Sequence, residues 1–238
     1  MVRHDFANKF QPQGLDALAV DLDGTLTSGG LPLKRRPAKA LRALKSSGTK
    51  IILATGRCVS EANRLVGEDL FDAIVAEEGA LLAIGGAKKN SAPAGWNEVR
   101  AHLSKHFKPG CEEVILSAGI DTLSAALNLI PSQAKIELNK DRLMIVPRGV
   151  DKGTGLADAL SRLHLKGART ACIGDGENDA PMFDVAGVRV ALKNSVPALK
   201  RRADFVTSGS DGEGTVQAIE KLFPWTKNHP PGRSVPEP

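Results

Sequence analysis

Short apolar runs and amphipathic segments alternate along most of the chain, and this pattern predicts strands and helices in turn. We expect strands at 15–21, 50–54, 71–75, 169–173, 188–192 and 205–206. We expect helices between or after them at 37–45, 60–66, 153–163, 178–185, 196–201 and 215–222. Strands that alternate with helices are typical of an α/β fold, so we expect a Rossmann-like parallel sheet with helices on both faces.

The middle of the chain, from 84 to 148, has a different pattern. It predicts a helix at 96–106, a strand at 113–116, a helix at 120–129, and two strands at 135–139 and 143–146 joined by a turn at 140–142. Strands joined by a hairpin favour an antiparallel sheet backed by helices. We therefore expect core segments at 14–83 and 149–224, a small α+β cap inserted at 84–148, and flexible tails at 1–13 and 225–238.

Two carboxylates follow the first apolar run, in the segment Asp21-Leu-Asp23-Gly24-Thr25. Residues i and i+2 of a strand point to the same side, so Asp21 and Asp23 can face one ligand. Gly24 allows the backbone to turn sharply around it. Two acids at one small site indicate a metal, a phosphate group or both, and the alternative is a solvated acidic turn.

Three further polar segments begin where apolar strands end, which is where open α/β sheets place their ligands. Thr55 and Gly56 follow the second strand, and an acidic turn from Asp175 to Asp179 follows the strand at 169–173. Lys152 lies where a helix begins, and a cation is mildly unfavourable there, which hints at a bound anion. Taken singly they fit a plain turn, a helix cap and a surface lysine.

Charge and cysteine usage narrow the class of protein. The 238 residues carry a formal charge of +5, but the 32 basic residues are interleaved with 27 acidic ones and Tyr is absent, so no nucleic-acid surface is expected. No apolar run approaches the ~18 residues that span a membrane, so we expect no membrane partner. Cys58, Cys111 and Cys172 are widely spaced, which predicts neither disulfides nor a zinc site, and favours a reducing cytoplasm.

The four segments, in this order, resemble the motifs of the haloacid dehalogenase superfamily of phosphohydrolases. The matches are D-x-D-G-T at 21–25, Thr55 at the end of a strand, Lys152, and G-D-x-x-N-D at 174–179. The position of the insert is similar to that in the superfamily branch, often called IIB, whose α+β cap lies between the second and third motifs. Within that branch the chain is most similar to archaeal-type phosphoglycolate phosphatases.

The resemblance implies a role for each motif residue. Asp21 would be the nucleophile that forms an aspartyl-phosphate, and Asp23 would be the general acid and then the general base. Magnesium would be held by the Asp21 carboxylate, the Asp23 backbone carbonyl, Asp175 and Asp179, because Mg²⁺ prefers oxygen ligands. The phosphoryl group would be bound by Thr55, Gly56, Lys152 and Asn178.

The substrate implied by the resemblance is a small phosphate ester, with 2-phosphoglycolate as the first candidate. A sugar-phosphate phosphatase, a phosphomutase-like phosphotransferase and a catalytically silent module of the same fold are the alternatives. The pattern fits a monomer or a homodimer equally.

Several residues outside the motifs bear on the substrate. Glu78 stands where relatives usually carry Asn, and a carboxylate there would repel an anionic substrate, so we expect it to face solvent or a cap residue, with a role in substrate binding as the alternative. Arg142 and Arg148 either hold a substrate carboxylate or are solvated. His102 and His106 lie four residues apart without the Glu of a zinc motif, so we expect an exposed helix face.

Overall fold

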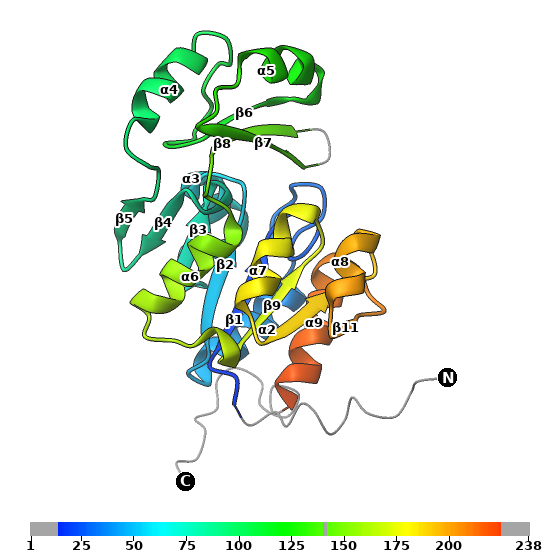
Figure 1. The fold of residues 1–238 in the computed structure, drawn as a ribbon. Coiled ribbons are helices and arrows are strands. Elements are labelled where there is room, and N and C mark those ends of the chain that lie inside the picture. The colour runs from blue at the N-terminus through cyan, green and yellow to red at the C-terminus, as the bar shows by residue number, and fades with distance from the viewer. Residues whose placement is uncertain (1–13, 140–141, 225–238) are drawn as a thin grey trace.

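The computed structural model describes residues 14–139 and 142–224, which form a larger core and a smaller cap (Figure 1). The predicted tails at 1–13 and 225–238, and part of the predicted turn at 140–142, lie outside the described residues. The cap lies beyond one end of the core sheet, at the carboxyl ends of its parallel strands.

The core is built on one eight-stranded sheet of order β11-β10-β9-β1-β2-β3-β4-β5. The six strands from β11 to β3 pair in parallel, as predicted. Their bounds are β1 (Ala17–Asp21), β2 (Lys50–Ala54), β3 (Ala73–Ala76), β9 (Thr170–Gly174), β10 (Val188–Ala191) and β11 (Phe205–Val206). The other two, β4 (Leu81–Ile84) and β5 (Ala87–Asn90), add an antiparallel edge. The main sheet thus continues past residue 83.

Helices cover both faces of this sheet, as the pattern predicted. The side chains of β1 alternate between the faces: Leu18 and Val20 pack in one apolar cluster, and Ala17 and Ala19 in the other. The first cluster includes residues of α2 (Arg35–Ser46), α3 (Val59–Val66) and α9 (Asp211–Leu222), and the second includes residues of α6 (Lys152–Arg162), α7 (Ala180–Val185) and α8 (Pro197–Arg202). Both faces of the strands are therefore buried, which is typical of a parallel sheet.

The cap is a three-stranded antiparallel sheet of order β6-β8-β7 with helices on the side away from the core (Figure 1). Its elements are α4 (Trp96–Leu103), β6 (Leu116–Gly119), α5 (Leu123–Leu129), β7 (Ala134–Asn139) and β8 (Arg142–Pro147). Trp96 and Leu103 of α4 and Ile145 of β8 are buried and belong to one apolar cluster. The predicted antiparallel arrangement is confirmed.

One cap strand starts later than predicted, because the backbone before it is bound to the core. The pattern predicted a strand at 113–116, but β6 begins at Leu116. The N–H groups of Glu113, Val114 and Ile115 donate instead to the carboxylate of Glu77, at 2.7 to 3.1 Å. Those donors are satisfied by a core side chain, so they are not available to a sheet ladder.

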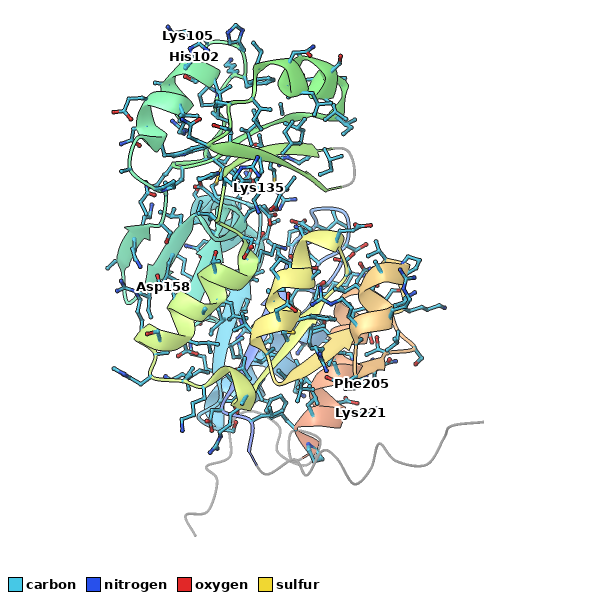
Figure 2. The ribbon with its side chains drawn as sticks, viewed as in Figure 1. His102, Lys105, Lys135, Asp158, Phe205 and Lys221 are labelled. Atoms are coloured by element: carbon cyan, nitrogen blue, oxygen red, sulfur yellow. A yellow bond between two sulfur atoms is a disulfide. The ribbon has the colours of Figure 1, made fainter. Side chains whose placement is uncertain are left out.

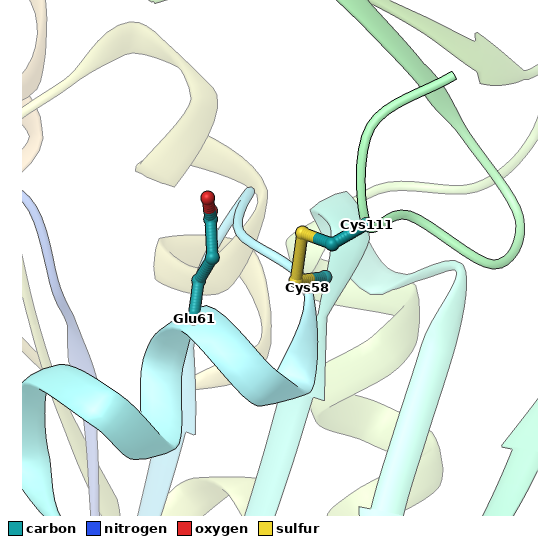
Figure 3. Close-up of side chains that lie close together, drawn as sticks. All are labelled: Cys58, Glu61 and Cys111. Carbon is teal, nitrogen blue, oxygen red and sulfur yellow. A yellow bond between two sulfur atoms is a disulfide. The ribbon is translucent and has the colours of Figure 1, made fainter.

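A disulfide also joins the cap to the core, and the prediction of no disulfide is wrong. Cys58 precedes α3, and Cys111 lies just before the cap segment that Glu77 binds (Figure 3). The two residues are 53 positions apart in sequence, and the local spacing rules did not reveal the pair. The cytoplasmic location stays a prediction, and the cysteine usage no longer supports it.

We expect this disulfide to contribute measurably to stability. A cross-link that closes a loop of this length restricts the unfolded chain, and reduction should lower the free energy of unfolding by roughly 2–4 kcal/mol. Urea unfolding with and without reductant measures this. The Cys58→Ser/Cys111→Ser double variant is the control, because reductant should not change its midpoint. Equal wild-type midpoints in both buffers, or three free thiols in the unreduced denatured protein, would contradict the disulfide.

No helix in 14–139 or 142–224 has both the length and the apolar character needed to cross a bilayer.

Candidate active site

Strand register brings the motifs together at one edge of the core sheet. In the parallel pairing of β1 with β2, Asp21 is opposite Ala54, and in the pairing of β1 with β9, Val20 is opposite Ile173. Asp21, Thr55 and Asp175 therefore leave three adjacent strands at the same level. This is the carboxyl edge where ligands of open α/β sheets bind.

Three aspartates form a buried cluster at this edge. Carboxylate oxygens of Asp21, Asp175 and Asp179 lie within 4.8 Å of one another, and all three residues are buried. Oxygen-only donors at this spacing fit a divalent cation such as Mg²⁺ or Ca²⁺. Asp23 is not a member of this cluster; the role predicted for it in metal binding involves its backbone carbonyl.

Lys152 is the cation of the cluster. Its Nζ lies 2.7 Å from Asp21 Oδ1 and 2.7 Å from Asp179 Oδ1, and its side chain is 1% exposed. Burial alone would lower the pKa of Lys152, but the carboxylates of Asp179 and Asp21 outweigh it and raise that pKa. The anions that the sequence hinted at near this helix start are thus two side chains of the protein itself.

One lysine cannot neutralise three carboxylates. Burial, and then the charge of Asp179, raise the pKa of Asp21 well above its ordinary value, although Lys152 opposes the shift. The cluster is therefore short of positive charge. A divalent cation would supply that charge and favour the ionised form of Asp21.

Close backbone approaches hold the carboxylates in place. A Cβ on Gly24 would lie 2.3 Å from Asp175 Oδ2, so only glycine fits this turn, where φ is +93°. The hydroxyl of Thr25 donates to Asp175 Oδ1 at 3.2 Å. The Asn194 amide donates to Asp175 Oδ2 at 3.2 Å and to the Gly24 carbonyl at 2.7 Å. The sequence pattern gave no signal for Asn194, which belongs to an ordinary turn after β10.

Asp179 combines a structural and an electrostatic role. Its Oδ2 accepts the backbone N–H groups of Asp175 and Gly176 at 2.8 and 2.9 Å, which fixes the acidic turn. Its Oδ1 accepts from Lys152. Asp179 directly precedes α7, but its carboxylate binds the turn and Lys152 and makes no cap hydrogen bond to α7.

Asp23 is held by a partner that sequence analysis did not single out. The Arg57 guanidinium binds both Asp23 oxygens, with Nε 2.6 Å from Oδ2 and the second contact at 2.9 Å. This bidentate pair fixes the direction of the carboxylate. Arg57 follows Thr55 and Gly56 directly, so its place in the second motif was the available signal.

Thr55 and Gly56 form a tight turn beneath the cap. The Thr55 hydroxyl accepts the Arg57 N–H at 3.1 Å. A Cβ on Gly56 would lie 2.5 Å from Glu78 Oε1 and 2.9 Å from the sulfur of Met144, which belongs to cap strand β8. The absence of a side chain at Gly56 is therefore what allows the cap and Glu78 to approach this turn.

Glu78 does not face solvent, so that one of the two expected locations is wrong. It is fully buried, and its Oε1 accepts a hydrogen bond from the Asn178 amide at 2.9 Å. Burial raises the pKa of Glu78 to about 8. Asn178, which was expected to orient Lys152 or the phosphate, donates this hydrogen bond to Glu78.

The predicted candidate arginines of the cap bind other cap residues, and its candidate histidines are exposed. Arg148 donates to the carbonyls of Ser132 and Ala134, and Arg142 donates to the Ser117 hydroxyl. His102 and His106 are exposed, as expected, and Figure 2 places His102 on the outer side of the cap. Lys135, on the side of the cap toward the core, pairs with Glu137 at 2.6 Å (Figure 2).

Comparison with known families agrees with this geometry. Residues 18–106 and 117–219 match the family described as haloacid dehalogenase-like hydrolases, and the chain belongs to that family. It is 33% identical over 231 residues to a phosphoglycolate phosphatase of Archaeoglobus fulgidus, covering 90% of this chain and 98% of the relative. It is 32% identical over 222 residues to a phosphoglycolate phosphatase of Methanosarcina mazei, covering 87% and 96%. The expectation of a phosphatase is confirmed.

Solved structures share the fold. A haloacid dehalogenase-like hydrolase from Bacteroides thetaiotaomicron superposes with a TM-score of 0.72 at 20% identity, covering 88% of this chain and 100% of that one. A subclass IIB sugar phosphatase of the superfamily gives 0.70 at 21% identity, covering 87% and 99%. The predicted fold class is confirmed.

Proposed function

We propose that this protein is a magnesium-dependent phosphomonoesterase that acts on a small phosphorylated metabolite through an aspartyl-phosphate. The observation that carries the proposal is the contact of Lys152 with both Asp21 and Asp179, inside a cluster of three carboxylates. A cation beside a candidate nucleophile suits the transfer of a phosphoryl group, whose oxygens carry negative charge in the transition state.

The side chains divide the chemistry between two steps. In the first, an Asp21 oxygen attacks phosphorus, the bond from phosphorus to the ester oxygen breaks, and Asp23 gives that oxygen a proton. In the second, Asp23 takes a proton from a water molecule that attacks the same phosphorus, and the Asp21 carboxylate is released with inorganic phosphate. Arg57 holds Asp23 in one orientation between the two steps.

The remaining motif residues bind the ligands. Asp21, Asp175, Asp179 and the Asp23 carbonyl would hold the magnesium ion, which neutralises charge on the phosphoryl oxygens when bound. Lys152, the Thr55 hydroxyl, the Gly56 N–H and Asn178 would bind those oxygens.

The first candidate substrate is 2-phosphoglycolate. The proposal is supported by relatives of that name, which the chain matches along nearly their whole length. A cytoplasmic location is part of the proposal, and a monomer and a homodimer both fit it.

The direct test is phosphate release by purified protein. We expect release from 2-phosphoglycolate with Mg²⁺, none above the blank after chelation, and recovery when Mg²⁺ is restored, because Lys152 alone does not balance the charge of the three carboxylates. A panel of phosphorylated metabolites, hexose phosphates included, ranks the substrates by kcat/KM. Undiminished release in excess chelator would contradict the metal dependence, and release from no member of the panel would contradict the function.

A further inference from the structure

Glu78 is a buried carboxyl group with half of its hydrogen-bonding capacity unused. Its Oε1 accepts from Asn178 at 2.9 Å, and its Oε2 is buried without a partner among the described residues. Buried polar atoms without partners are uncommon in native proteins, and each calls for a physical reason. At this place a bound substrate can supply the missing partner.

The backbone conformation at Glu78 brings its carboxyl group close to the motif residues. Glu78 has φ of 56° and ψ of 30°, the left-handed region that Asn, Asp and Gly adopt most easily. The missing side chain at Gly56 leaves room for its Oε1. The carboxyl group thus lies against the turn after β2 and beside Asn178, and the cap residue Met144 contacts the same turn.

The charges around Glu78 do not hold it in its ionised form. Burial has the largest effect and raises its pKa. Lys152 of α6 and the hydrogen bond from Asn178 lower it, while Glu137 of β7 and Asp179 raise it. No lysine, arginine or histidine in the described ranges forms an ion pair with it within 4.0 Å. With a pKa of about 8, Glu78 carries a proton at neutral pH. A protonated carboxyl group is a hydrogen-bond donor, and here the donor has no acceptor within the described part of the chain.

We propose that Glu78 determines substrate specificity by donating a hydrogen bond from Oε2 to an anionic oxygen, such as a carboxylate, on the substrate's leaving group. This inference rests on the proposed phosphatase function. Glu78 lies between the residues proposed to bind phosphate and the cap, which is where the leaving group would extend. The proton removes the repulsion between two carboxylates that the sequence suggested, and puts a hydrogen bond in its place.

The test compares two substrates that differ in one group, 2-phosphoglycolate and 2-hydroxyethyl phosphate. For the wild type, we expect the ratio of their kcat/KM values to fall about tenfold between about pH 6.5 and pH 9.5, because ionised Glu78 repels the carboxylate. The Glu78→Gln variant keeps a neutral donor, so its ratio should change less than about twofold over that range. Glu98→Gln, which removes an exposed acid of α4, is the matched control and should follow the wild type.

A second readout does not depend on turnover. With Mg²⁺ present, the rise in Tm caused by 2-phosphoglycolate should shrink with pH in the wild type and not in Glu78→Gln. The free wild type should also lose Tm relative to Glu78→Gln between about pH 5 and pH 8, because the folded state keeps a proton that the unfolded state releases. If neither substrate is hydrolysed but these shifts occur, the phosphatase function fails and the Glu78 assignment stands. A pH-independent ratio and Tm shift in the wild type would overturn the assignment.

Discussion

The Asp21→Asn variant should release phosphate no faster than the buffer blank. Loss of a catalytic nucleophile typically lowers kcat by on the order of 10⁴ or more, because an amide cannot form the acyl-phosphate bond. The substitution keeps the size of the side chain. We expect the effect in a sensitive phosphate-release assay at saturating Mg²⁺, with the substrate that the panel ranks first.

The same variant should remain folded, which separates loss of chemistry from loss of structure. Burial raises the pKa of Asp21, so the ionised form is costly in the free protein, and a neutral amide removes that cost. Lys152 keeps Asp179 as its partner. The Tm of Asp21→Asn should therefore be no lower than that of the wild type. Asp69→Asn, at an exposed position, should keep full activity. Wild-type release by Asp21→Asn would exclude Asp21 as the nucleophile.

The periodic pattern of the sequence was enough to predict the layered core. Strand and helix periods are local, and residues such as Leu18 and Ala19 show by alternation that both faces of β1 are covered. The start of β6 could not be read in this way. It depends on the Glu77 carboxylate, which takes up three N–H groups from 113–115, more than 30 residues further along the chain.

The motif residues were also accessible from sequence, because each one follows an apolar strand and parallel strands end at a common edge. Their partners were not. Arg57 meets Asp23, Cys58 meets Cys111, and neither contact follows from spacing or propensity. Glu78 shows the limit most clearly. Charge repulsion alone predicted that Glu78 faces solvent or a cap residue. Its raised pKa means that Glu78 is buried in its neutral form, so no charge has to be desolvated.

Lys152→Met is expected to have the second largest effect, on stability and on rate together. The substitution removes the cation that contacts Asp21 and Asp179 and leaves two buried carboxylates without it. Breaking a buried ion pair in this way typically costs roughly 3–5 kcal/mol. We expect that loss in the free energy of unfolding measured by urea in the presence of a chelator. The rate should fall by on the order of 10² to 10³, the typical effect of losing one preorganised donor to the transition state.

Magnesium should then restore more stability to Lys152→Met than to the wild type. Without the lysine, the cluster of Asp21, Asp175 and Asp179 is more negative and gains more from a divalent cation. The rate should not recover with it, because the cation proposed to bind the phosphoryl group is gone. Lys39→Met, on the exposed side of α2, controls for the loss of one surface charge and should match the wild type in both assays. A variant that unfolds like the wild type in chelator would show that Lys152 does not stabilise the cluster.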